Sequence, residues 1–347
     1  MNKNAILKLD NFINDYYAEH KNSGVIRVTL KDKILYKKNV GYADIESKKE
    51  FDSNSMFTFY SLSKPFCAIG LMLLKDKGLI SLDEHPSKYL PETKVFDSKL
   101  TIRHLLQHVS GLPDFVQTAK FNEKYKTGYY SQIREHLKEL TSYSMVFEPG
   151  TKNMYANVNY ILCALIIENV TGLKYSDYMK KEVFEPLGMN TATIDSESLV
   201  VDNRVTGYEL NDGVVTKTDR DLNWLVGAGD IIGTIDDLYA LNKAIKHKKL
   251  LTEDSWCEVL TPLPLNNRGF GCTITDWHGK KRITHTGGSR GFRNLHIQLI
   301  EDDFDIIFLS NSGWGNARND LSEAIYEAFY GKNDENSQEV EMDKGYI

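Results

Sequence analysis

The sequence lacks the features that mark membrane, secreted or nucleic-acid-binding proteins. No apolar stretch approaches the roughly 18 residues of a membrane-spanning helix, and the apolar run over residues 161–167 ends at Glu168, as in a buried helix. Near the amino terminus, Lys8 and Asp10 interrupt the apolar core that a signal peptide needs. The net charge of −6 gives no reason to expect nucleic acid or an anionic membrane as a partner. We therefore expect a cytoplasmic protein without a membrane span and without a nucleic-acid partner.

Cysteine is also scarce. The four cysteines are widely spaced and include no Cys-x-x-Cys pair, so the sequence indicates neither a disulfide framework nor a metal site. We expect them to be reduced residues of the core: Cys67, Cys163, Cys257 and Cys272. His104 and His108 lie four residues apart, as in some metal-binding helices, but no acidic partner pattern accompanies them. We interpret both histidines as structural residues.

The order of the predicted elements indicates the fold class. Residues 24–30 and 34–40 predict a hairpin, and four more strands are predicted after residue 255, before a closing helix over about residues 317–329. The segment between these ends consists mainly of helices and long connections. This order predicts an α+β fold, in which an antiparallel sheet flanked by helices is built from both chain ends and an all-helical domain is inserted between them.

Three regions follow from this prediction. Residues 1–60 and 255–332 would form the sheet domain, residues 61–254 the mainly helical domain, and residues 333–347 a polar tail. The cleft between two such domains is a natural pocket for a ligand. Ser61 lies in the sequence where the sheet part gives way to the helical part.

The chemistry starts from Ser61 and Lys64, at the beginning of a predicted apolar helix. Residues three apart on a helix are neighbours, and a serine hydroxyl needs an adjacent base to become a strong nucleophile. A lysine is such a base only if burial or nearby cations lower its pKa. Pro65 has no N–H for the carbonyl of Ser61, which predicts that Ser61 lies at or just before the first turn. A Ser-x-x-Lys pair alone occurs by chance about once in a chain of this length.

A second pair, Tyr155 and Asn157, precedes a predicted helix that ends near Gly172. A phenol can donate and accept protons, and an amide can hold a substrate carbonyl, if both side chains enter one cleft. The alternative is a packed tyrosine followed by a turn asparagine.

A third segment, His285-Thr286-Gly287-Gly288, would end a strand. Its glycines would let a substrate backbone approach closely, and a free backbone N–H there could form an oxyanion hole with that of Ser61. The alternative is a glycine-rich hairpin turn that carries an incidental histidine.

Together and in this order, the three elements resemble the penicillin-recognising serine hydrolase family. The resemblance is to the branch of class C β-lactamases, D-alanyl-D-alanine carboxypeptidases, D-aminopeptidases and esterases. Five further segments resemble the same branch: residues 101–113, 148–150, 170–172, 186–189 and 227–230. The resemblance implies a β-lactamase/transpeptidase-like fold and acyl transfer through an ester intermediate, with no metal and no cofactor.

The resemblance also implies a role for each motif residue. The catalytic residues would be the nucleophile and the two groups that share the proton transfers: Ser61, Lys64 and Tyr155. The substrate-binding residues would be Asn157, His285, Thr286, Gly287 and Gly288. The backbone N–H groups of Ser61 and Gly288 would form the oxyanion hole.

One departure concerns the substrate. β-Lactamases of this branch carry lysine where this chain has His285, and histidine is mostly neutral at pH 7. Two arginines, Arg282 and Arg290, flank the motif, and we expect both at the surface or at a sheet edge. We therefore predict a penicillin-binding-protein-like serine hydrolase that acts on an ester or a small D-amino-acid peptide amide. The alternatives are a β-lactamase proper and a slowly deacylating penicillin-binding sensor or scaffold.

Overall fold

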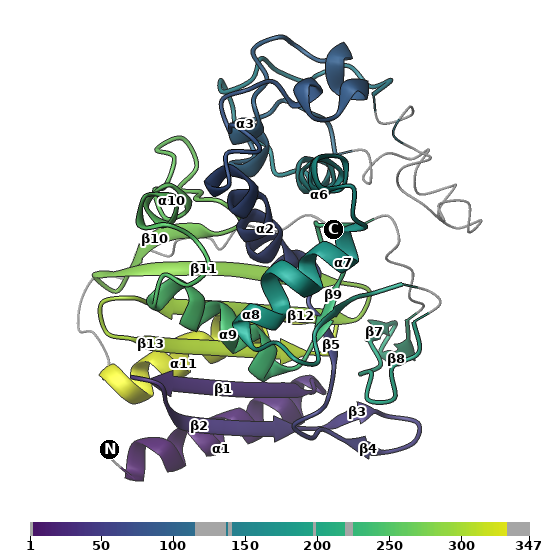
Figure 1. Ribbon diagram of the computed structural model, residues 1–347. Coiled ribbons are helices and arrows are strands. Elements are labelled where there is room, and N and C mark those ends of the chain that lie inside the picture. The colour runs from purple at the N-terminus through teal and green to yellow at the C-terminus, as the bar shows by residue number, and fades with distance from the viewer. Residues whose placement is uncertain (1–2, 115–136, 138–140, 197–198, 219–224, 332–347) are drawn as a thin grey trace.

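A six-stranded antiparallel sheet forms the base of the protein (Figure 1). The computed structural model describes residues 3–114, 137, 141–196, 199–218 and 225–331. The strands lie in the order β10-β11-β12-β13-β1-β2. Their bounds are β1 Gly24–Leu30, β2 Lys33–Val40, β10 Thr273–Trp277, β11 Lys280–Ser289, β12 Phe292–Leu299 and β13 Phe304–Ser310. Since β1 pairs with β13, from Gly24 opposite Ser310 to Leu30 opposite Phe304, the two chain ends share one sheet.

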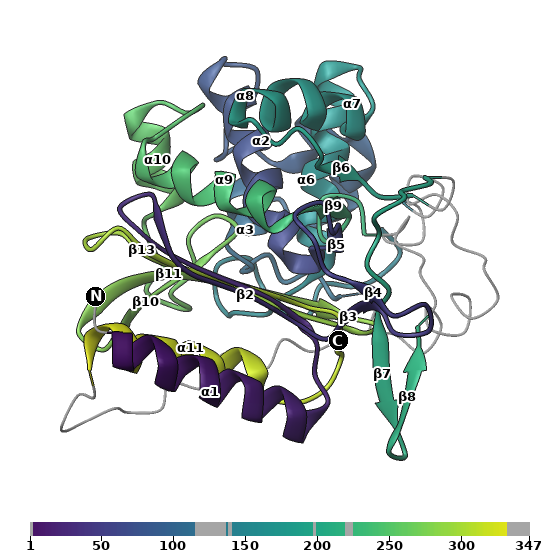
Figure 2. The ribbon, with the colours of Figure 1, turned by 90° about the horizontal axis from the view of Figure 1, so that it is seen from below.

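Two helices from the chain ends cover one face of this sheet (Figure 2). They are α1 Lys3–His20 and α11 Ala317–Tyr330. In α1, residues at helical spacing such as Leu9, Ile13 and Tyr16 are buried, because they pack with the apolar side chains of the strands above. This layer forms a separate hydrophobic core on that side of the sheet.

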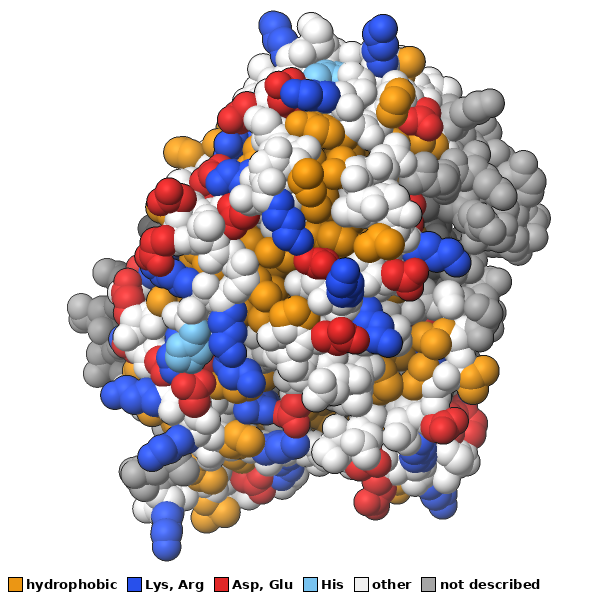
Figure 3. Space-filling view, viewed as in Figure 1, with side chains coloured by type: hydrophobic (Ala, Val, Ile, Leu, Met, Phe, Trp, Pro, Cys, Tyr) orange, Lys and Arg blue, Asp and Glu red, His pale blue; other side chains and the backbone are white. Residues whose placement is uncertain are grey.

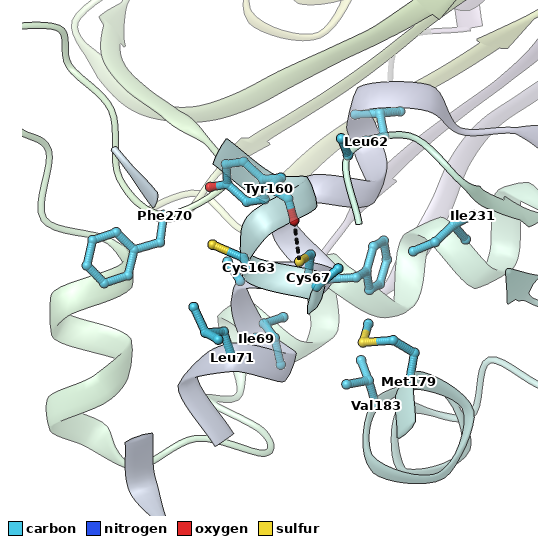
Figure 4. Close-up of a cluster of buried hydrophobic side chains, with 14 of the residues drawn as sticks. Leu62, Cys67, Ile69, Leu71, Tyr160, Cys163, Met179, Val183, Ile231 and Phe270 are labelled. Carbon is cyan, nitrogen blue, oxygen red and sulfur yellow. Dashed lines mark hydrogen bonds between the residues drawn. The ribbon is translucent and has the colours of Figure 1, made fainter. Parts of the chain in front are cut away.

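The helical part lies on the opposite face (Figures 1 and 2). At its centre, α2 Lys64–Asp76 is buried from Lys64 to Leu74, as expected for a helix that is apolar on all sides. It packs against α6 Asn157–Thr171, which ends at Gly172 with a left-handed φ of 70°. In Figure 4 the Cys67 thiol of α2 lies 3.8 Å from the Tyr160 carbonyl oxygen of α6. The other helices of this part are α3 Ile102–Leu106, α7 Tyr175–Met179, α8 Glu185–Leu187, α9 Ile235–Lys246 and α10 Glu253–Val259, with the short helical turns η1 Tyr60–Ser63, η2 Pro86–Lys88, η3 Pro91–Val95 and η6 Lys180–Phe184.

Short strands connect the two parts. The three-stranded sheet β5-β9-β6 leads directly into η1, and two hairpins, β3-β4 and β7-β8, stand at one end of the large sheet. The bounds are β3 Tyr42–Asp44, β4 Lys49–Glu50, β5 Phe57–Thr58, β6 Thr193–Ile194, β7 Tyr208–Asn211, β8 Val214–Lys217 and β9 Ile231–Gly233.

The predicted α+β fold is confirmed, including the sheet built from both chain ends. The division into domains stays a prediction, and the polar tail 333–347 lies outside the described residues. Charged side chains of both signs are scattered over the face seen in Figure 3, as expected for a nearly balanced charge.

Two expectations about single residues are wrong. Cys257 is exposed on α10, whereas the other three cysteines are buried as predicted. Arg282 is not a surface residue, because only 4% of it is exposed and its guanidinium lies 5.1 Å from the centre of the Trp277 ring. The long side chain is buried by packing along an aromatic ring, which a sequence pattern of alternating residues does not reveal.

Candidate active site

Ser61 lies in the turn η1, immediately before α2 begins at Lys64 with a proline in its first turn. This is the placement that Pro65 predicts. The preceding residue, Tyr60, has φ of +50°, which is unusual for a bulky side chain. Its ring is buried and packs 5.7 Å from the ring of Phe292 on β12. The large sheet therefore holds the turn in a conformation that a free chain would rarely adopt.

The side-chain nitrogen of Lys64 lies within hydrogen-bond distance of three oxygen atoms. Nζ lies 2.9 Å from Ser61 Oγ, 2.9 Å from Asn157 Oδ1 and 2.7 Å from the Ala228 carbonyl oxygen. The lysine has no exposed surface. The amide and backbone oxygens can only accept hydrogen bonds, so they hold two N–H groups of Lys64. In the neutral amine the remaining position is a lone pair, and it is directed to Ser61.

The surroundings of Lys64 favour this neutral form. Burial is the largest effect and lowers its pKa, since a charge is costly away from water. The carboxylate of Asp114 acts in the opposite direction, and the positive charge of Arg268 adds to the effect of burial. Together these effects bring the pKa of Lys64 to about 7. Near neutral pH a large fraction of the protein molecules therefore carries the neutral amine, which can accept a proton.

Tyr155 approaches the serine from the other side. Its hydroxyl lies 2.8 Å from Ser61 Oγ, and Lys64 Nζ lies 4.8 Å from the centre of its ring. The ring of His108 stacks on the phenol with the two centroids 4.3 Å apart. Burial holds the pKa of His108 well below its usual value, so this histidine stacks as a neutral ring. Its Nδ1 accepts a hydrogen bond from the Ala156 N–H, which fixes the backbone just after Tyr155.

Asn157 is the first residue of α6, and Asp114 holds it in place. Both the backbone N–H and the side-chain Nδ2 of Asn157 donate to the Asp114 carboxylate at 3.1 Å. The carboxylate is buried, and this burial raises its pKa to about 6. Asp114 was not identified from the sequence, although it directly follows the segment 101–113 that resembles the family.

His285 presents a neutral ring to the site. Its Nδ1 lies 2.6 Å from the Thr286 carbonyl oxygen, which can only accept, so Nδ1 carries the proton. Burial holds the pKa of His285 well below its usual value, and the charges of Lys64 and Arg268 act in the same direction. The ring centroids of His285 and Tyr155 are 6.4 Å apart. The third motif therefore brings no positive charge of its own.

Gly287 packs closely against the turn that carries Ser61. A Cβ at this position would lie 2.1 Å from the Phe59 carbonyl oxygen and 3.1 Å from the Leu62 nitrogen. The backbone of the turn that carries Ser61 therefore approaches this glycine closely. At Gly288 a Cβ would lie 2.8 Å from the Phe292 carbonyl oxygen of the neighbouring strand. These contacts place β11 directly beside the turn that carries Ser61.

Comparison with known proteins fits this geometry. A sequence model described as Beta-lactamase matches residues 9–328. The chain belongs to the beta-lactamase family.

Relatives of this beta-lactamase-family protein include penicillin-binding protein 4* of Bacillus subtilis (strain 168), which is 30% identical over 90% of this chain and 73% of its own length. A D-aminopeptidase of Gluconobacter oxydans (strain 621H) is 24% identical over 83% of this chain, and the chain spans 55% of that protein. The octameric penicillin-binding protein homologue from Pyrococcus abyssi superimposes with a TM-score of 0.83 at 24% identity, covering 94% of this chain and 78% of that one. Membership of this family confirms the prediction of a hydrolase.

Among the described residues, no helix is long and apolar enough to cross a membrane.

The beta-lactamase-family fold brings the predicted residues together. Ser61, Lys64, Tyr155 and Asn157 form one hydrogen-bonded cluster, and residues 285–288 of β11 lie beside it. Among the described strands, β11 pairs only with β12 beyond Thr284, so its other edge makes no strand pairing there. Three residues that contact the motif residues were not singled out in the sequence: Asp114 and the Ala228 carbonyl accept hydrogen bonds from Asn157 and Lys64, and Arg268 lies over the Tyr155 ring. His108, which we expected to be a structural residue, stacks on Tyr155.

Proposed function

We propose that this protein is a serine hydrolase that forms an acyl-enzyme on Ser61. The observation that carries the proposal is the position of Ser61 Oγ, 2.9 Å from Lys64 Nζ and 2.8 Å from the Tyr155 hydroxyl. A hydroxyl between a neutral amine and a phenol has both a proton acceptor and a proton donor within reach.

In the proposed reaction, Ser61 Oγ attacks the carbonyl carbon of the substrate while its proton passes to Lys64. The oxyanion accepts hydrogen bonds from the backbone N–H groups of Ser61 and Gly288. The carbon–nitrogen or carbon–oxygen bond then breaks, and the leaving amine or alcohol takes a proton from the Lys64–Tyr155 pair. Water attacks the resulting ester and gives its proton to the same pair. The acyl–Oγ bond breaks, the pair returns a proton to Ser61 Oγ, and the acid is released.

The proposed substrates are esters and small amides, including peptides with D-amino acids. The neutral ring of His285 supports this choice, because it offers no fixed cation to the carboxylate of a β-lactam. The names of the relatives, a penicillin-binding protein and a D-aminopeptidase, agree with it. The unpaired edge of β11 supports binding of an extended peptide backbone, which would add to the sheet as a further strand.

A labelling experiment tests the proposed nucleophile. We expect a fluorophosphonate probe to label the wild-type protein at Ser61 and to leave Ser61→Ala unlabelled. Ser63→Ala is a matched control, since Ser63 lies two residues away and its Oγ accepts a hydrogen bond from the Ile231 N–H instead. Equal labelling of wild type and Ser61→Ala would show that another residue is the nucleophile.

Turnover separates the proposed hydrolase from the two alternatives. Steady hydrolysis of p-nitrophenyl esters and D-alanyl peptides, faster than that of the cephalosporin nitrocefin, is the expected result. Faster nitrocefin hydrolysis would favour a β-lactamase. A burst of one equivalent followed by no turnover on every substrate would favour a penicillin-binding sensor.

A further inference from the structure

Arg268 lies beside the proposed catalytic groups and belongs to none of the three motifs. Its side chain is 6% exposed, and its guanidinium carbon lies 5.0 Å from the centre of the Tyr155 ring. Lys64 Nζ approaches the same ring to 4.8 Å. An arginine stays protonated throughout the physiological pH range. A permanent positive charge is therefore held against the phenol that contacts Ser61.

The loop that carries Arg268 is anchored to the active site at several points. At Gly271, with φ of +75°, a Cβ would lie 2.6 Å from Pro65 Cα, so the loop backbone packs on the first turn of α2. Asn266 Nδ2 donates to the Gln107 carbonyl at 2.8 Å and to Asn153 Oδ1 at 3.0 Å. The Asn266 Oδ1 in turn accepts from the Arg268 N–H at 3.0 Å. The loop is thus joined to α2 and to the segments before His108 and Tyr155.

Several charged or titratable groups surround Lys64 from these elements. The nearest partners are Ser61 of η1, Asn157 at the start of α6 and Tyr155 just before that helix. The groups that act over a longer distance are Cys67, His108, Asp114, Tyr160, Asp230, Arg268 and His285. Asp114 and Asp230 favour the protonated lysine, and Arg268 favours the neutral one. Burial holds His108 and His285 in their neutral forms. The positive charge of Arg268 therefore opposes the two carboxylates around the amine.

We propose that Arg268 is a positioning residue: its charge, held against the same Tyr155 ring as Lys64, adds to burial in favouring the form of Lys64 that can accept the proton of Ser61. The inference rests on the proposed function, because it concerns the proton acceptor of that reaction. Direct binding of a substrate carboxylate by Arg268 is disfavoured, since most of its surface is already covered by protein.

The test is the pH dependence of acylation. The second-order rate of acylation by a neutral p-nitrophenyl ester is measured between pH 5.5 and 9.5 for the wild-type and variant enzymes. In Arg268→Gln we expect the midpoint of the acid limb to move up by about one pH unit, because a like charge near Lys64 is removed. The rate near pH 6 then falls about tenfold, and the two enzymes converge near pH 9. Arg268→Lys should keep the wild-type midpoint.

Two further variants separate charge from packing. Thr273→Asp places a carboxylate where Thr273 Oγ1 now lies 3.5 Å from Arg268 Nη1, and should shift the midpoint upward with the arginine still present. This variant answers the question even if Arg268→Gln does not fold. Arg282→Gln is the matched control, since Arg282 is also buried on an aromatic ring, that of Trp277, and should leave the midpoint unchanged.

Three results would contradict the role of Arg268. One is a wild-type midpoint in both Arg268→Gln and Thr273→Asp, which would make the arginine a packing residue. Another is an equal shift in Arg282→Gln. The third is a loss of acylation rate in Arg268→Gln that is confined to substrates with a carboxylate, with no shift of the midpoint. A wild-type enzyme that is never acylated at Ser61 would instead overturn the proposed function.

Discussion

The carboxylate of Asp114 accepts two hydrogen bonds from Asn157, one from the backbone N–H and one from the side-chain Nδ2, each at 3.1 Å. With Nδ2 turned to the carboxylate, the amide oxygen of Asn157 faces Lys64 Nζ, at 2.9 Å. A flipped amide would direct two N–H groups at the amine and lose both the carboxylate and the lysine as partners. Asp114 therefore fixes the direction of the amide and also contributes the negative charge that favours protonated Lys64.

Replacing Asp114 should change both properties. In Asp114→Asn we expect the midpoint of the acid limb to move to lower pH, because the charge that favours protonated Lys64 is removed. The plateau rate should fall about tenfold, since the orientation of Asn157 is no longer enforced. Asp305→Asn is the matched control, because Asp305 is also buried and accepts from an asparagine, Asn242 Nδ2 at 2.7 Å. A shift to higher pH in Asp114→Asn would refute the charge argument.

Lys64 should give the wild-type enzyme a simple pH profile. Because the neutral amine is the active form and its pKa is about 7, the rate of acylation should rise about tenfold per pH unit well below pH 7 and level off above it. In Lys64→Arg the side chain stays charged at every accessible pH, so no such rise is expected. The acylation rate of both enzymes is measured with a p-nitrophenyl ester as a function of pH. A flat wild-type profile between pH 5.5 and 9 would exclude Lys64 as the base.

Gly287→Ala should lose activity more than stability. The added Cβ meets the Phe59 carbonyl oxygen at 2.1 Å, so β11 or the nucleophile turn must shift. We expect acylation to fall by at least about tenfold, because small displacements of reacting groups are costly to catalysis. Gly279→Ala is the control: it has a positive φ of 74° but no atom within 4 Å, so it should cost about 1 kcal/mol of stability and leave activity intact. Similar activity of both variants would contradict the tight contact.

His296 should make the protein less stable in acid. It lies on β12 beneath α2, lines a small apolar cavity with Pro65 and Ile69, and its Nε2 has no partner among the described residues. Burial lowers its pKa to about 4. Between pH 6.5 and 4 the unfolded chain binds a proton there and the folded chain does not, so this site lowers stability as pH falls.

The comparison with His296→Leu isolates this effect from the other titrating groups. Relative to wild type, the variant should gain stability as the pH falls from 7 to 4, by up to about 3 kcal/mol in the free energy of unfolding. Urea unfolding at several pH values measures the difference. His247→Leu, at a half-exposed histidine, is the control in which no comparable gain is expected. A difference that does not change with pH would show that His296 is not buried in its neutral form.

The sequence was sufficient for the parts of the fold that alternation and helical spacing encode. Residues 24–30 form β1 with the predicted bounds, and the closing helix predicted over residues 317–329 is α11, from Ala317 to Tyr330. The cluster of Ser61, Lys64, Tyr155 and Asn157 was expected from the family resemblance that the three ordered motifs carry. These features depend on local spacing or on reactive side chains.

The remaining features depend on contacts between distant segments. Arg268 and Asp114 act on Lys64 through space, and nothing in their own neighbourhoods distinguishes them from other loop residues. The exposure of Cys257 and the burial of Arg282 were mispredicted for the same reason, since the face of an element that becomes covered depends on what packs against it. The close packing of Gly287 could not be predicted either, because its neighbour is the carbonyl oxygen of Phe59, which is far away in the sequence.

That backbone contact has a consequence for how this enzyme could acquire new substrates. A Cβ at Gly287 would meet the Phe59 carbonyl oxygen and the Leu62 nitrogen, so strand β11 and the turn that carries Ser61 pack closely, backbone against backbone. A larger side chain at Gly287 would therefore have to push the strand and the turn apart. If the proposed function holds, new substrates would be accommodated by changing side chains that project from the strand, such as His285, rather than by moving the strand itself.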